Sequence, residues 1–176
     1  LLLLLLAGQD VFLLSSPGPY TRRLAQTFLS LLNTPYEIVT LHRDVGESEL
    51  KQGREIRPGG KLEWTDSGAV RAAKEGKVLI LDGIERVERG VLPLLNNLLE
   101  YREMVRRWFS SSVSLARLLA RASAEPHPLA QNLEDGTHLV SAARYDKMVE
   151  NGEDTTSFIP THPDFRIIAL GVPVPP

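Results

Sequence analysis

The sequence lacks cysteine, lacks an excess of positive charge and has no apolar run long enough to cross a bilayer. Without cysteine there can be no disulfide bonds, thiolate metal sites or cysteine nucleophiles, which fits a reducing, intracellular compartment. The formal net charge of -2 over 176 residues gives no basic field for counterion release, so we expect no nucleic-acid partner. The four histidines lie far apart, and no pair has the spacing of a metal site.

Six leucines open the sequence without an initiating methionine, so we interpret the chain as a segment of a longer protein or an incomplete gene model. This run is too short for a transmembrane helix and has no basic flank of a signal peptide, so we expect no integral membrane segment. We expect it instead to be the buried end of a helix. The apolar fraction of 43% and the charged fraction of 24% predict one soluble globular domain.

Apolar periodicity alternates between strand and helix spacing along the chain. Strands are predicted at residues 11–14, 36–41, 77–81 and 165–170, of which the first and the last have the pattern of buried strands. Helices are predicted at 22–32, 67–75, 91–99 and 141–149. A helical turn is predicted at 47–50, a glycine-rich break with a short extended stretch at 53–64, and a hairpin at 133–140. This order predicts an α/β fold, a three-layer sandwich with a mainly parallel sheet whose ligands lie at the carboxyl ends of the strands.

Residues 105–130 depart from this pattern, because they hold four arginines and a serine cluster with Glu125 as their only acid. We interpret them as an insertion, a loop or a mis-spliced stretch, within a single domain that covers residues 1–176. The alternative is an amphipathic helix around 113–122 that meets a membrane surface or a partner.

A loop between the first predicted strand and the first long helix has the position and length of a phosphate-binding loop. The candidate nucleotide-binding residues are Ser15, Ser16, Pro17, Gly18, Pro19, Tyr20, Thr21, Arg22 and Arg23. In the consensus G-x-x-x-x-G-K-[ST], glycines let backbone N–H groups wrap the phosphates, the lysine meets the outer phosphates and the hydroxyl holds magnesium. Those four positions are here Ser15, Tyr20, Thr21 and Arg22, in that order. Gly18 is the glycine that the loop keeps.

Arg22 and Arg23 fall in the first helical turn, where the macrodipole disfavours cations by roughly 0.3 to 1 kcal/mol each. A bound anion would remove that penalty, so both are candidates to replace the lysine as phosphate contacts. The alternative is that they are solvated surface arginines.

The run from Val78 to Asp82 has the four apolar residues and the aspartate that end a Walker B strand. That carboxylate orients magnesium through water, which makes Asp82 the candidate metal residue and Mg²⁺ the candidate ion. The next residue, a catalytic glutamate in working ATPases of this kind, is here Gly83. The nearest acid is Glu85, a weak catalytic candidate two residues further on.

The block from Asp44 to Met104 resembles the AAA+ ATPases of the dynein-related, midasin-like and MoxR-like group. Its carrying stretches are GESELKQGREI at 46–56 and AVRAAKEGKVLILDGIERVERGVLPLLNNLLEYREM at 69–104. The resemblance implies an AAA+ core, ATP with Mg²⁺ as its ligands, and neighbouring modules or subunits in a ring as partners. The sensor position that ends the last strand is Val172, no arginine finger can be assigned, and the helical lid of the family is not represented.

A narrower resemblance covers nearly the whole chain outside 105–130. DVFLLSSPGPYTRR, LEDGTHLVSAARYDKM and FRIIALGVPVP look like the first module of family members that combine several AAA+ modules with a von Willebrand factor A domain. This resemblance implies ATP binding, an ATPase parent and a mitochondrial address.

Three hypotheses follow for function. The first is an AAA+ module that binds ATP but hydrolyses it poorly, because the lysine and the catalytic glutamate are both replaced. The second is a structural ring or scaffold module that binds no nucleotide. The third is a true ATPase that uses Arg22 and Glu85 in unusual roles.

Overall fold

The computed structural model describes residues 1–102, 104 and 137–173. The predicted insertion at 105–130 lies outside the described residues, so its boundaries stay a prediction. Within the described residues no helix is long and apolar enough to cross a membrane.

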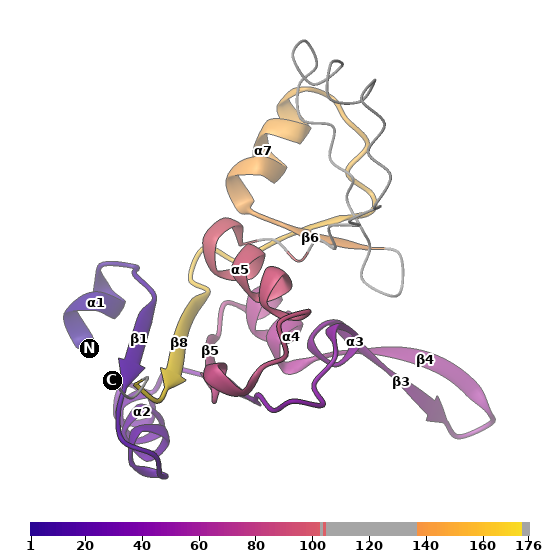
Figure 1. Ribbon diagram of the computed structural model, residues 1–176. Coiled ribbons are helices and arrows are strands. Elements are labelled where there is room, and N and C mark those ends of the chain that lie inside the picture. The colour runs from indigo at the N-terminus through magenta and orange to yellow at the C-terminus, as the bar shows by residue number, and fades with distance from the viewer. Residues whose placement is uncertain (103, 105–136, 174–176) are drawn as a thin grey trace, which may run out of the picture.

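The centre of the described fold is a parallel sheet whose strand order is β1-β8-β5-β2 (Figure 1). These strands are β1 (Val11–Leu14), β2 (Tyr36–Thr40), β5 (Val78–Asp82) and β8 (Arg166–Gly171). Each neighbouring pair runs parallel, with β5 and β8 in the middle. The predicted α/β fold with a mainly parallel sheet is confirmed.

Both central strands are buried on both faces because their apolar side chains alternate between two cores. In β5, Val78 and Ile80 join the core beneath α2 (Tyr20–Leu31), whereas Leu79 and Leu81 join the core on the other face. The residues of β8 divide in the same way. This period of two explains why an uninterrupted apolar run forms a strand between two helical layers.

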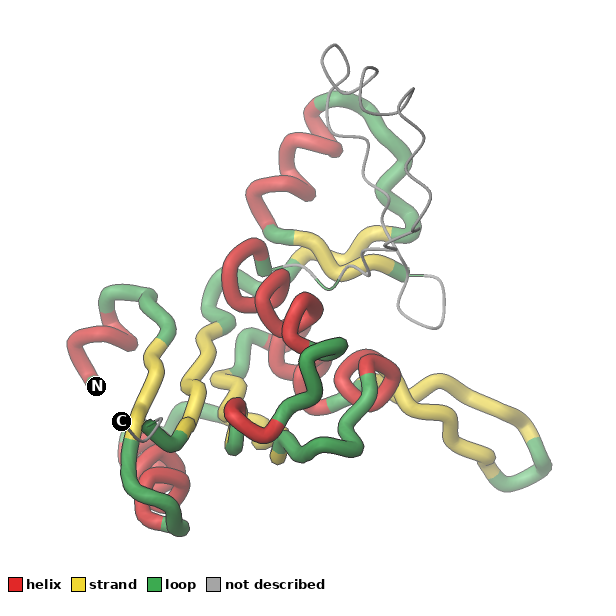
Figure 2. The backbone as a smooth tube through the Cα atoms, in the orientation of Figure 1, coloured by secondary structure: helices red, strands yellow, loops and turns green. Residues whose placement is uncertain are grey.

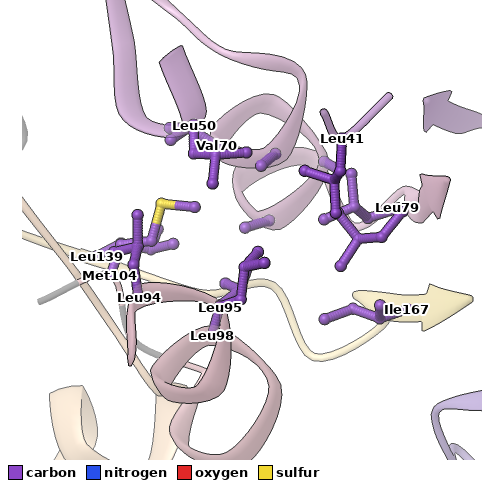
Figure 3. Packing of buried hydrophobic residues seen from close by; sticks show 14 of the residues in the cluster. Leu41, Leu50, Val70, Leu79, Leu94, Leu95, Leu98, Met104, Leu139 and Ile167 are labelled. Carbon is purple, nitrogen blue, oxygen red and sulfur yellow. The ribbon is translucent and has the colours of Figure 1, made fainter. Parts of the chain in front are cut away.

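The larger core lies between the sheet and the helices α3 (Glu47–Lys51), α4 (Gly68–Glu75) and α5 (Leu92–Tyr101). Leu94, Leu95 and Leu98 of α5 point from one side toward Leu50 and Val70 on the other (Figure 3). Helix α4 begins where the Ser67 hydroxyl accepts a hydrogen bond from the Val70 N–H, and it ends at Gly76, whose φ of 73° favours glycine.

Polar contacts of Asp10, just before β1, join this strand to the end of α5 and to β8. The Asp10 carboxylate lies 2.8 Å from Nη2 of Arg102, which follows α5, and accepts the Ile167 N–H of β8 at 2.8 Å. The short strands β6 (His138–Val140) and β7 (Phe158–Pro160) form a parallel pair, and α7 (Ala142–Glu150) follows β6. Leu139 also bridges Met104, so the described part of the predicted 133–140 hairpin, residues 137–140, belongs to a different pairing.

The predicted extended stretch at 62–64 is confirmed, whereas the glycine-rich break predicted before it was wrong. Residues 52–66 form a hairpin of β3 (Gln52–Arg57) and β4 (Lys61–Asp66) that extends away from the sheet (Figure 2). Apart from its base the hairpin is largely exposed, so its residues are mostly polar on both faces and apolar alternation gave no strand signal. Gly59 and Gly60, at φ values of 101° and 76°, belong to the turn rather than to a break.

The expectation of a buried leucine helix was also wrong. The run does form a helix, α1 (Leu2–Leu6), but none of these residues is buried and Leu3 is 81% exposed. Only Leu1 and Leu5 pack, partly buried, against the core beneath α2. Strand β1, predicted as buried, is an edge strand, with Phe12 55% and Leu14 57% exposed, because β8 is its one strand neighbour among the described residues.

An ion-pair cluster fastens β2 to α4. Glu37 lies 3.1 Å from Nη2 of Arg71 and 3.1 Å from Nζ of Lys77. The hydrogen bond from Arg71, with help from Lys77, holds the pKa of Glu37 below its usual value despite partial burial. A lowered pKa means that the folded state favours the charged carboxylate, so the cluster stabilises the fold above the pKa that Glu37 has in the unfolded chain.

Replacing Leu98 with alanine should lower the free energy of unfolding by about 2–5 kcal/mol, because it leaves a cavity in the larger core. Leu31, at the end of α2, is 81% exposed, so Leu31→Ala should change it by less than about 0.5 kcal/mol. Urea denaturation measures both. Equal effects of the two substitutions would contradict the assigned core.

Glu37→Gln should cost about 1–2 kcal/mol of unfolding free energy at neutral pH, because it removes the charge that Arg71 and Lys77 bind. The deficit should shrink as pH falls below about 4.3, where Glu37 takes up a proton in the unfolded chain before it does so in the folded one. Glu75→Gln removes a carboxylate that is 52% exposed and should cost less than about 0.5 kcal/mol. Denaturation across a pH series tests this, and a constant Glu37→Gln deficit from neutral to acid pH would refute it.

Candidate functional site

The carboxyl ends of β1 and β8 lie near α2 (Figure 1). A small pocket is lined there by residues at the ends of β5 and β8 and by the loop that leads from β1 into α2. Its lining residues are Ser15, Ser16, Gly18, Thr21, Arg22, Asp82, Gly83, Glu85, Arg86, Leu170, Gly171 and Val172. The pocket lies at the edge of the sheet at which the sequence predicts the ligand site. The pocket is open to solvent on one side, and its volume is about 30 Å³, room for little more than one water molecule.

The loop brings the free N–H groups of a helix start to this pocket. Helix α2 begins at Tyr20, and Pro19 at its N-cap provides no side-chain hydrogen bond within the described part of the chain. Gly18 turns the chain with a φ of 143°, a value that favours glycine. A helix start with uncapped N–H groups carries partial positive charge and attracts anions.

Thr21 stands at the lysine position of the consensus loop, and its short side chain lines the pocket without bringing a charge into it. Its side chain is buried, with 8% exposure, and its hydroxyl contacts the hydroxyl of Ser15. The Ser15 N–H donates to the Gly171 carbonyl at 3.2 Å, which ties the loop to the end of β8. This arrangement holds the loop against the sheet but adds no positive charge.

Arg22 supplies the positive charge instead. Its Nη1 lies 3.3 Å from Oδ2 of Asp82, and the two side chains are 42% and 27% exposed. Asp82 is fixed at the end of β5, where its carbonyl accepts the Leu41 N–H at 2.8 Å. The arginine of the first helical turn and the strand-end aspartate thus form an ion pair inside the pocket.

Gly83 occupies the position of the catalytic glutamate in a backbone conformation that favours glycine. Its φ and ψ are 88° and 42°, and its N–H donates to the Leu170 carbonyl at 3.2 Å. A Cβ atom built there would lie 3.0 Å from the Leu41 carbonyl oxygen. The backbone after Asp82 therefore differs from one that a glutamate adopts without strain.

The remaining lining groups offer no obvious base for water. Glu85 pairs with its neighbour Arg86, with Oε1 and Nε 3.1 Å apart, in the short 3₁₀ turn η1 (Ile84–Arg86). Val172, at the sensor position, lines the pocket with an apolar side chain.

The structure brings together only part of the predicted set. Ser15, Ser16, Gly18, Thr21 and Arg22 of the loop line the pocket together with Asp82 and Glu85. Pro17, Pro19, Tyr20 and Arg23 are not among its lining residues, and Tyr20 is 72% exposed. The sequence reasoning missed Arg86. The signal for it was its position, four residues after the strand-end aspartate Asp82.

The comparisons with known proteins show the family of the chain. The model of the AAA domain of the dynein-related subfamily matches residues 10–175. The chain belongs to this subfamily. Mouse von Willebrand factor A domain-containing protein 8 is 42% identical over 174 residues, which cover 97% of this AAA domain and 8% of the mouse protein.

Two more distant relatives share less with this dynein-related AAA domain. An uncharacterized protein of Staphylococcus aureus (strain USA300) is 25% identical over 110 residues, 60% of this chain and 42% of that protein. The crystal structure of a candidate ATPase from Cytophaga hutchinsonii superposes with a TM-score of 0.54 at 13% identity, covering 99% of this chain and 37% of that one. At that identity the likeness concerns the fold alone.

AAA domains generally bind ATP with Mg²⁺ and often assemble into oligomers, so the residues present can be compared with those ligands. The uncapped helix start and Arg22 suit the phosphates of a nucleotide. The magnesium donors are altered, because the hydroxyl position is Arg22 and the Asp82 carboxylate already faces a guanidinium. The pocket of this AAA domain fits an anion better than a hydrated cation.

Gly83→Ala should lower the free energy of unfolding by about 1–2 kcal/mol, because alanine is strained at positive φ. Gly90→Ala is the matched control, since a Cβ atom there meets nothing within 4 Å. It should leave stability within about 1 kcal/mol of the original value. Thermal denaturation compares them, and equal stability of the two variants would contradict the strain assigned to Gly83.

Proposed function

We propose that this AAA module binds ATP at the pocket between β1, β5 and α2 and hydrolyses it poorly. The observation that carries the proposal is the Arg22 guanidinium at the uncapped start of α2, next to Asp82. An arginine there meets the unfavourable end of the helix dipole, and an anion in the pocket offsets that cost. Asp82 provides one such anion, and the outer phosphates of ATP provide a stronger one.

Poor hydrolysis follows from three altered positions of the family consensus: the lysine, the catalytic glutamate and the polar sensor, which are here Thr21, Gly83 and Val172. Thr21 adds no charge near the outer phosphates, and its hydroxyl contacts Ser15. Gly83 carries no carboxylate to activate water, and Glu85 is paired with Arg86. Loss of the glutamate removes the activation of water, and loss of the lysine removes charge at the outer phosphates, which Arg22 replaces in part. The module can therefore keep affinity for ATP while losing turnover.

The small volume of the pocket favours the second candidate function, a structural module without nucleotide. A pocket of about 30 Å³ is far below the roughly 300 Å³ of a typical ligand site. For ATP to enter, the Arg22 side chain must turn from its present position. Because the Arg22 side chain is 42% exposed, breaking or shifting its ion pair with Asp82 costs little.

The remaining parts of the proposal concern the protein's surroundings. Neighbouring AAA modules or subunits in a ring are proposed as partners, with hydrolysis carried out by sister modules. A mitochondrial address is proposed from the family resemblance alone, and microscopy of the tagged protein tests it.

ATP should raise the melting temperature of the chain, whereas adenosine, which has no phosphates, should not. At about ten times its Kd a ligand adds about 1.4 kcal/mol, which corresponds to a rise of roughly 3–6 °C for a domain of this size. Gly18→Val should abolish the rise, since valine displaces the loop that presents the N–H groups. Gly59→Val, at the tip of the hairpin, is the control, because both glycines have positive φ and open space around a Cβ atom.

No stabilisation at millimolar ATP would refute nucleotide binding and leave the structural module. Phosphate release should stay at background in the same samples. Turnover that Asp82→Ala abolishes would instead support a working ATPase.

A further inference from the structure

Two positions hold magnesium in consensus P-loop proteins, the hydroxyl residue after the loop lysine and the aspartate that ends a neighbouring strand. In this chain they are Arg22 and Asp82, and their side chains form an ion pair with 3.3 Å between Nη1 and Oδ2. The cation facing Asp82 therefore belongs to the protein. We propose that the Arg22 guanidinium replaces the magnesium ion, so that the site binds nucleotide phosphates without a divalent metal. This inference rests on the proposed nucleotide binding.

A guanidinium can serve Asp82 and a phosphate at the same time. The guanidinium carries five N–H donors in a planar arrangement, and the contact with Asp82 is made by Nη1. The remaining donors match the spacing of two phosphate oxygens. Arg22 lies in the first turn of α2 and lines the same pocket as Thr21 of that turn.

The neighbouring groups do not favour a magnesium ion. Magnesium requires near-octahedral oxygen ligands and keeps several waters, whereas Thr21 is buried with its hydroxyl on Ser15. Glu85 is held by Arg86, whose guanidinium also lines the pocket. In the described part of the chain no group of three or more histidine, cysteine, aspartate or glutamate residues is arranged to hold a metal ion.

Charge strengthens this argument. A magnesium ion at Asp82 would lie close to the Arg22 guanidinium and near that of Arg86, and like charges at such distances repel. The metal would have to displace Arg22 from its carboxylate before binding. Phosphate oxygens meet the opposite situation, since the guanidinium groups of Arg22 and Arg86 attract them.

The test is a calorimetric titration of the full chain with ATP, once with magnesium chloride and once with excess EDTA. We expect the two Kd values to agree within about threefold, with binding in EDTA equal or tighter. A loss of tenfold or more in EDTA, a difference of about 1.4 kcal/mol, would overturn the metal replacement and leave nucleotide binding intact. Failure to bind in both buffers would overturn the proposed function and this inference with it.

Arg22→Ser restores the consensus hydroxyl and removes the guanidinium. We expect its affinity for ATP in EDTA to fall by about tenfold or more, and magnesium to recover most of the loss. Arg57→Ser is the matched control, because it removes one positive charge from the exposed hairpin. It should bind ATP as the unaltered chain does in both buffers. An Arg22→Ser variant that still ignores magnesium would also overturn the inference.

Discussion

The burial of β5 on both faces is the constraint on which the rest of the structure depends. Its alternating side chains fill one core beneath α2 and another beneath α4 and α5, so the strand can neither shift register nor turn over. Its last residue, Asp82, is therefore held at a fixed point at the edge of the sheet. The neighbouring strands hold the same point, through the Leu41 N–H on one side and the Leu170 carbonyl on the other.

Arg22 reaches that fixed carboxylate from an element that packs separately. Helix α2 is anchored to the sheet by Ala25 and Leu29, one turn and two turns beyond the arginine. The rigid contact thus lies below the pocket, and the long side chain of Arg22 spans the remaining distance. A cation at a helix start is unfavourable by itself, so Asp82 stabilises it through Nη1, and the other donors of the same guanidinium remain for a phosphate.

The sequence predicted the elements in which apolar residues recur at the spacing of a buried face. These are the parallel strands and the helices α2, α4 and α5. The prediction failed at the hairpin, where exposure on both faces removes that spacing, and at α1, where a leucine run proved largely exposed. It identified the site's edge from strand ends but could not separate Arg22 from Arg23. Adjacent residues on a helix point about 100° apart, and only the position of Asp82 decides which one enters the pocket.

The altered positions differ in how deeply they are built into the fold. Arg22 and Thr21 are changes of side chain at the start of α2, where the proposed phosphate site would use the uncapped helix end. Gly83 is a change of backbone, because its positive φ directs the chain into η1 and brings Glu85 and Arg86 to the pocket. A glutamate placed at 83 would be strained there and would also disturb the turn that follows. The anion-binding half of the site is therefore compatible with this fold, whereas the water-activating half is not.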